Sequence, residues 1–145
     1  MKVQQYENHK QYYPAHHFVF YPVILALLGT AIWFGVNRED ERPIWFFLAA
    51  LVAVTGWLSF MLRQHYAVTL QNRIVLMELR YRYFSITQQQ FEPLEAALSK
   101  GQLFALRFAS DEELPALAER ALKERLTGTE IKKAIVNWRA DWMRV

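Results

Sequence analysis

The sequence contains no cysteine among its 145 residues, and glycine and proline contribute only five residues each. The absence of cysteine excludes a disulfide framework, a zinc site built on thiolates and a cysteine nucleophile. The sequence also lacks a Gly-rich phosphate-binding loop, a nucleophile elbow and a His-x-x-x-His pair. We therefore expect a protein that is not an enzyme and binds no cofactor.

Charge is absent from two 19-residue stretches, 18–36 and 44–62, in which 31 of 38 residues are apolar. A helix of 19 residues is about 28 Å long, which is close to the roughly 30 Å hydrocarbon core of a bilayer. The rest of the chain is too short to bury two such helices in a soluble core. We predict two transmembrane helices, and the first is too long for the apolar run of a cleaved signal peptide.

The short segment 37–43 connects the two spans, and in it Asn37 suits the end of a helix and Pro43 suits the first turn of the next one. Six Lys or Arg residues lie in the leader or in the first 20 residues after Leu62, whereas two lie in the loop. Because positively charged residues are retained in the cytoplasm, we predict that both termini are cytoplasmic and that the acidic loop is external.

The spans contain no Asp, Glu, Lys, Arg or His, which argues against a proton relay or an ion pathway formed by one copy. Small residues recur four positions apart at Ala31 and Gly35, and again at Ala49 and Ala53. Such spacing lets helix backbones approach closely. Packing of the two spans within one chain is the favoured interpretation, and a seam between two copies is the alternative.

Helical periodicity continues beyond the second span, and we predict one helix over 44–85. A break at 63–65 is the weaker alternative, because no Gly or Pro lies there. Apolar residues at alternating spacings of three and four predict a coiled-coil seam, formed by Ala67, Leu70, Ile74, Met77, Tyr81 and Phe84. A second apolar strip, at Val75, Leu76 and Leu79, indicates two partners. One is the C-terminal domain, and the other is the N-terminal leader or a second copy.

Four motifs of the form Ser/Thr-x-x-Glu/Gln begin at Thr87, Ser99, Ser110 and Thr127, and they are typical of capping boxes. They predict short helices over approximately 88–98, 100–108, 111–126 and 129–138. A domain of this size has a marginal core, so we expect it to pack against the long helix or a second copy.

The N-terminal leader is rich in Tyr and His, so we expect it to lie along the headgroup zone or across the base of the hairpin. His16, His17 and His65 are expected at similar depth, and imidazoles brought together can ligate a metal or haem. Adjacent histidines point in different directions on a helix, and no carboxylate lies at a ligand spacing. Interfacial histidines are therefore the favoured interpretation over a metal site.

Charged groups outside the spans suggest two further surfaces. Arg107 with the acidic cluster 111–113 forms one, although these carboxylates also suit a helix N-terminus. The last predicted helix is basic through Lys132, Lys133, Arg139 and Arg144. Its sequence "IKKAIVNWR" follows a short helix and a turn, as in a helix-turn-helix. Residues 63–145 carry a net charge of only +3, which is too low for phosphate-dominated binding of DNA.

Three segments combine uncommon residues in one order: "YENHKQYYPAHHFVFYP", "GQLFALRFASDEELP" and "IKKAIVNWRADWMRV". On these segments the chain resembles, over nearly its whole length, a family of small bacterial two-pass membrane proteins known only as a domain of unknown function. The resemblance implies a helical fold in the bacterial inner membrane. It implies no activity and no site residues.

The predicted fold is all-α, a transmembrane helical hairpin whose long second helix extends into a small cytoplasmic helical domain. Its parts are a leader (1–17), two spans (18–36 and 44–62) joined by a loop (37–43), a helical extension (63–86) and a domain (87–145). The leading hypothesis is a membrane-anchored interaction or scaffold module. Its expected partners are the lipid bilayer, an unidentified protein and a second copy bound through Ala31, Gly35, Leu70, Ile74 and Met77. A membrane-tethered sensor that binds nucleic acid, or a metal or haem, is the alternative.

Overall fold

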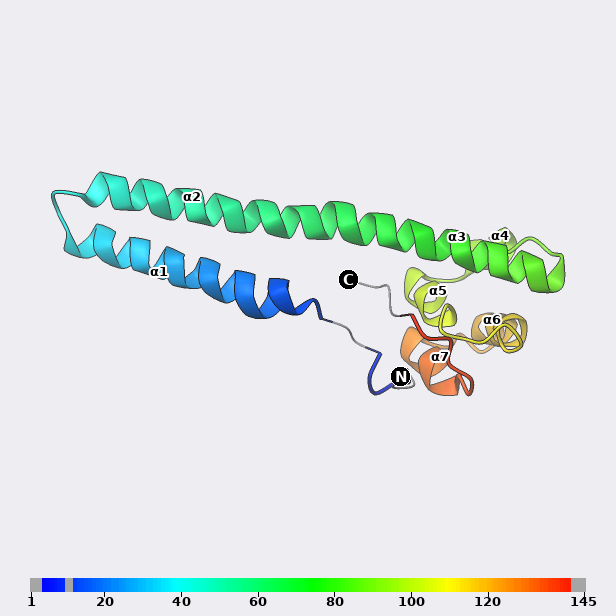
Figure 1. Ribbon diagram of the computed structural model, residues 1–145. Helices are drawn as coiled ribbons and strands as arrows, with labels where there is room; N and C mark the ends of the chain where they lie inside the picture. The colour runs from blue at the N-terminus through cyan, green and yellow to red at the C-terminus, as the bar shows by residue number, and fades with distance from the viewer. Residues whose placement is uncertain (1–3, 10–11, 142–145) are drawn as a thin grey trace. The chain divides into compact units, whose positions relative to one another are not determined.

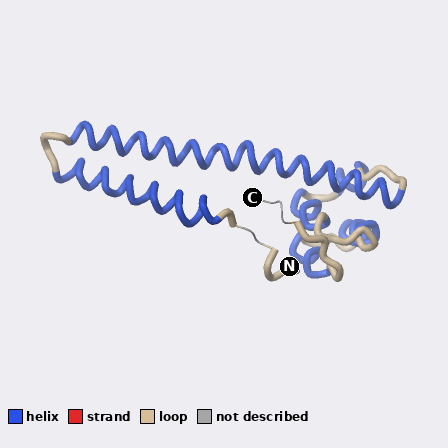
Figure 2. Tube along the Cα trace, viewed as in Figure 1, coloured by secondary structure: helices blue, strands red, loops and turns tan. Residues whose placement is uncertain are grey.

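Helices make up all the named elements of the computed structural model, which describes residues 4–9 and 12–141 (Figure 2). The α-helices are α1 (Tyr21–Asn37), α2 (Arg42–Met61), α3 (Val68–Thr87), α4 (Glu92–Ala97), α5 (Lys100–Leu106), α6 (Leu114–Lys123) and α7 (Gly128–Ala134). Two six-residue π-helices, η1 (Ala15–Phe20) and η2 (Leu62–Ala67), directly precede α1 and α3. The all-α prediction is confirmed.

The chain divides into two compact units. The hairpin unit comprises residues 12–69, and the helical unit comprises the described residues 4–9 and 70–141. The predicted long helix is confirmed, since α2, η2 and α3 form one helical run of 46 residues, Arg42–Thr87 (Figure 1). The segment η2 lies where a break was the alternative. Its hydrogen bonds run from residue i to i+5, so the backbone stays helical there.

Within the hairpin unit, α1 and α2 lie antiparallel and in contact with each other (Figure 1). Ala31 and Gly35 are buried in the hairpin. A Cβ added to Gly35 would lie 3.3 Å from the ring of Phe46. The rings of Phe34 and Trp45 stack with their centroids 4.5 Å apart. Ala31 and Gly35 therefore serve packing within one chain, which is the interpretation that the sequence favours.

The connection between α1 and α2 satisfies its own polar groups. The side-chain amide of Asn37 donates to the Trp33 carbonyl oxygen at 2.7 Å and covers the end of α1. The indole N–H of Trp45 donates to Glu41 Oε2 at 2.9 Å. Pro43 lies in the first turn of α2, where the missing N–H has no helical acceptor. Asn37 and Pro43 occupy the positions expected from the sequence.

The side chains on the outer surface of the hairpin unit are large and apolar. Leu25, Phe47 and Trp57 are each about two-thirds exposed. The helical runs Ala15–Asn37, of 23 residues, and Arg42–Thr87 are both long and apolar enough to cross a membrane.

The helical unit surrounds a core to which α3 contributes one face. Its most deeply buried side chains come from α3, from the loops and from the short helices: Leu79, Phe91, Leu106, Phe108, Leu114 and Ile131. Capping boxes are present at Ser99 and Thr127, where each hydroxyl and the side chain three residues on accept reciprocal backbone N–H bonds. The other two motifs differ. Thr87 ends α3, with its hydroxyl bonded to the Tyr83 carbonyl, and Ser110 accepts from Glu113 in a turn that precedes α6.

The four short helices exist, but each is shorter than predicted. The chain leaves α3 through Gln88, whose φ of 58° breaks the helix, and α4 begins only at Glu92. The last predicted helix, 129–138, ends at Ala134 because Ile135 is extended. Extension lets Trp138 form a bridge with Ala109, and long-range pairing thus replaces the last helical turn.

Helices α5 and α7 approach closely at two glycines. A Cβ on Gly128 would lie 2.6 Å from the carbonyl oxygen of Gly101, whereas a Cβ on Gly101 would meet nothing within 4 Å. Gly128 is therefore required by packing, and Gly101 is not.

We expect Gly128→Ala to lower the free energy of unfolding by roughly 1–3 kcal/mol, because the backbone of α5 must move away. The matched change Gly101→Ala is expected to leave stability unchanged or to raise it by up to about 1 kcal/mol, since alanine is the better helix former. Thermal unfolding of the full chain in mild detergent, followed by circular dichroism, measures both. Equal effects of the two substitutions would contradict this assignment.

Candidate functional site

Helix α3 has one buried face and one exposed apolar face. The buried residues of α3 are Val75, Leu79, Arg82 and Tyr83. The predicted strip through Val75 and Leu79 is thus the one that packs on the C-terminal domain. The seam residues are exposed instead, with Met77 at 66% and Tyr81 at 74%. We call this exposed set the α3 stripe, formed by Leu70, Ile74, Met77, Tyr81 and Phe84.

Charged residues lie on both flanks of the α3 stripe. At 100° per residue, Arg73 and Arg80 fall on one flank and Glu78 falls on the other. Arg80 forms two hydrogen bonds with Glu95, Nε to Oε2 at 2.6 Å and Nη2 to Oε1 at 2.9 Å, and these lower the pKa of the Glu95 carboxyl. Arg73 is exposed. The stripe is therefore basic on one side and acidic on the other.

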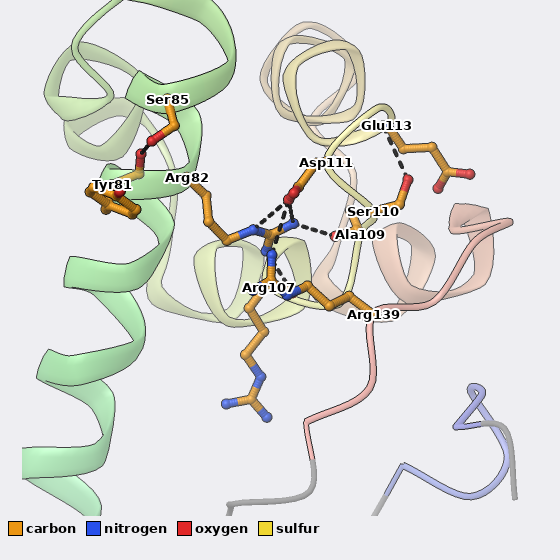
Figure 3. Close-up of polar contacts among 9 residues, drawn as sticks. All are labelled: Tyr81, Arg82, Ser85, Arg107, Ala109, Ser110, Asp111, Glu113 and Arg139. Atoms are coloured by element: carbon orange, nitrogen blue, oxygen red, sulfur yellow. Dashed lines mark hydrogen bonds and ion pairs between the residues drawn. The ribbon is translucent and has the colours of Figure 1, made fainter. Parts of the chain in front are cut away.

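Arg82 fixes α3 to the segment between α5 and α6 (Figure 3). Its guanidinium donates to Asp111 Oδ1 at 2.8 Å, to the Arg107 carbonyl at 3.0 Å and to the Ala109 carbonyl at 2.7 Å. Only 9% of the residue is exposed, and burial lowers the pKa of Arg82. The hydrogen bond from Arg82 lowers the pKa of Asp111, and the charge of Arg139, whose Nη1 lies 3.1 Å from Oδ1, acts in the same direction.

The charged surface expected at residues 107–113 is used mainly inside the helical unit. Asp111 accepts from Arg82 and Arg139, as described above. The Glu113 carboxylate accepts the backbone N–H groups of Val136 and Asn137 at 3.2 and 2.9 Å. Arg107 forms an ion pair with Asp141 at 3.5 Å. These groups tie the chain segments together.

The described part of the leader, residues 4–9, lies on the helical unit and not in the hairpin. Gln4 exchanges two hydrogen bonds with the backbone of Asp141, at 2.7 and 3.5 Å. His9 lies within ring contact of Phe108 and Trp138, and its Nε2 is 3.1 Å from Lys132 Nζ. The expectation that the leader is docked is confirmed for this segment. Its expected place in the headgroup zone or at the hairpin base stays a prediction.

The two π-helices bring His17 and Arg63 together in the hairpin unit. Arg63 Nη1 donates to His17 Nε2 at 2.8 Å, and His17 Nδ1 lies 3.0 Å from the Tyr13 carbonyl oxygen. A carbonyl oxygen only accepts, so Nδ1 carries the proton and Nε2 is the acceptor for Arg63. The imidazole is therefore neutral in this arrangement.

Of the three histidines considered as metal ligands, His16 and His17 lie side by side, and His65 does not share their surroundings. His16 and His17 are neighbours with ring centroids 5.6 Å apart, whereas His65 is exposed on η2. The lone pair of His17 that could bind a metal faces Arg63. Across residues 4–9 and 12–141, no group of three or more His, Asp or Glu side chains is placed to hold a metal ion.

A groove of about 290 Å³ opens beside this contact, and we call it the π-helix groove. Its walls come from η1, η2 and the residues next to them: Tyr13, His16, Ser59, Leu62, Arg63 and Ala67. The Nε2 atom of His16 is buried and has no hydrogen-bond partner among the described residues. The groove thus combines an apolar wall, one cationic group and the ring of His16.

The model of a family of unknown function, DUF6526, matches residues 1–145. The chain belongs to the DUF6526 family. The comparison with curated proteins gives no match, and neither does the comparison with solved structures. DUF6526 membership therefore agrees with the resemblance seen in the sequence, and it carries no assigned activity.

Two features of this DUF6526 chain were missed at the level of sequence. Arg82 follows Leu79 by three residues and Val75 by seven, so it falls in the register of the buried strip, and that spacing was a usable signal. The π-helices have no comparable signal, because 15–20 and 62–67 carry the composition of ordinary helix.

We expect Asp111→Asn to destabilise the DUF6526 chain at neutral pH and to have much less effect in acid. The folded-state pKa of Asp111 lies below its unfolded value, so its contribution is present above about pH 4 and is lost as the pH falls through the folded pKa. Urea unfolding at pH 7 and near pH 2.5 measures the difference. Asp40→Asn, an exposed loop position, is the matched control and should change neither value. A loss of stability that is equally large at the two pH values would contradict the stabilising role given to the ionised Asp111 carboxylate.

Proposed function

We propose that the chain is a non-enzymatic, membrane-anchored interaction module of the bacterial inner membrane. The hairpin unit is its anchor, and the helical unit carries its interaction surface. The exposed α3 stripe is the observation on which this proposal rests, because a long exposed apolar face on a soluble helix marks a binding surface.

The anchoring part of the proposal is supported by the outer surface of the hairpin. Its exposed side chains, such as Phe47 and Trp57, suit lipid better than water. The distribution of Lys and Arg supports an arrangement with both termini in the cytoplasm and the loop outside.

We expect a single cysteine at Asp40 to be labelled by an impermeant thiol reagent in intact cells. The native chain contains no cysteine, so Asp40→Cys gives a unique site in the exposed loop. Lys123→Cys, at an exposed position on α6, should be labelled only after the membrane is permeabilised. Labelling of Lys123→Cys but not Asp40→Cys in intact cells would reverse the orientation, and release of the protein by alkaline carbonate would contradict anchoring.

The partner proposed for the α3 stripe is a second copy of the chain. Two copies inserted in one membrane have the same orientation, so their α3 helices run parallel. The stripe has the alternating three and four spacing of a two-stranded coiled coil. In a parallel pair in register, Arg73 of one copy lies beside Glu78 of the other, five residues on, and the relation is reciprocal. An antiparallel pair would place like charges together instead.

We expect Ile74→Cys to form a disulfide-linked dimer when membranes are oxidised, since Ile74 would face its own counterpart across the parallel pair. Glu119→Cys, on the exposed side of α6, should remain monomeric under the same conditions. Gel electrophoresis without reducing agent distinguishes the two species.

Arg73→Glu tests the charge pairing separately. Two attractive pairs become two repulsive ones, so self-association should weaken about tenfold. Analytical ultracentrifugation in detergent measures this change. Dimer formation that is insensitive to Arg73→Glu, together with cross-linking at Glu119→Cys equal to that at Ile74→Cys, would contradict the parallel α3 pair.

A further inference from the structure

We propose that the π-helix groove binds one anionic phospholipid, with its phosphate on Arg63 and an acyl chain along the apolar wall. This inference rests on the proposed insertion of the hairpin into a membrane. The argument uses the charge of Arg63, the chemistry of the groove and the position of the groove along α2 and η2.

The charge of Arg63 is not matched by a carboxylate in the hairpin unit. Residues 12–38 and 42–69 contain no Asp or Glu, and the three acidic residues of this unit lie in the loop at the other end of α1 and α2. The hydrogen bond that Arg63 donates goes to the neutral ring of His17. A guanidinium has five N–H donors in a planar fork that matches phosphate oxygens, so it can hold His17 and a phosphate together.

The groove beside Arg63 is amphipathic, which favours a lipid over free phosphate. Leu62, Ala67 and the ring of Tyr13 line it, and these groups suit a hydrocarbon chain. The ring of His16 also lines the groove, and its Nε2 atom is buried without a hydrogen-bond partner among the described residues. Inorganic phosphate would leave the apolar wall uncovered.

The position of the groove agrees with the depth of lipid phosphates. Arg63 directly follows the uncharged stretch 44–62, so in a hairpin that spans a bilayer its guanidinium reaches the headgroup region. The π-helical turn in η2 places Leu62, Arg63 and Ala67 along one groove. Such turns occur frequently at functional sites.

Native mass spectrometry of the full chain in mild detergent tests the site. The protein is mixed with equal amounts of dioleoyl phosphatidylglycerol and dioleoyl phosphatidylcholine, and the retained lipid is identified. We expect one phosphatidylglycerol per chain, retained about tenfold less by Arg63→Gln, because a charge-assisted hydrogen bond is lost. Arg63→Lys, which keeps the charge, should show intermediate retention and guards against a folding defect in Arg63→Gln.

Arg38→Gln is the matched control, because Arg38 lies at the opposite end of the hairpin and is paired with Glu41 at 3.6 Å. It should retain phosphatidylglycerol as the native chain does. Glycerol 3-phosphate and inorganic phosphate should not compete, and competition by either would point to a free phosphate site and overturn the proposal. Equal retention of the two lipids, or equal loss in Arg38→Gln and Arg63→Gln, would also overturn it. If the protein resists carbonate extraction but retains no lipid, the anchor stands and only the lipid site fails.

Discussion

The buried guanidinium of Arg82 determines which face of α3 is turned inward. Its donors are matched by the Asp111 carboxylate and by two backbone carbonyls of the segment between α5 and α6. An unmatched charge at this depth would be strongly destabilising. A rotation of α3 about its axis would break all three hydrogen bonds of Arg82 at once, so this face of α3 stays turned inward. Val75, Leu79 and Tyr83 share the face with Arg82 and are buried with it. The α3 stripe is consequently left exposed, although it is the more regular apolar pattern.

Features governed by composition and local chemistry could be predicted from the sequence. The two uncharged stretches predict the two helices of the hairpin, since a backbone in apolar surroundings must satisfy its hydrogen bonds within the helix. The predictions of capping boxes at Ser99 and Thr127 are confirmed, because all the donors and acceptors of each box lie within four residues. Asn37 and Pro43 are correct for the same reason.

Features governed by long-range contacts could not be predicted in the same way. The leader segment 4–9 lies on the helical unit because Gln4 bonds the backbone of Asp141, more than 130 residues away in the chain. The last helix ends early because Trp138 pairs with Ala109. The contact between His17 and Arg63 joins residues 46 positions apart, and it depends on π-helical turns for which no residue preference is visible.

Arg63 differs from Arg80 and Arg82 in what matches its charge, and the lipid site that we propose rests on this difference. Arg82 is matched by a carboxylate and buried carbonyls, and Arg80 by both oxygens of Glu95. Their donors bond groups of the chain itself, which leaves little charge for a ligand. Arg63 donates to a neutral imidazole in a unit whose carboxylates all lie in the distant loop. In the membrane arrangement that we propose, an unmatched charge near lipid is costly, and the lipid phosphate proposed for the π-helix groove supplies the counter-charge.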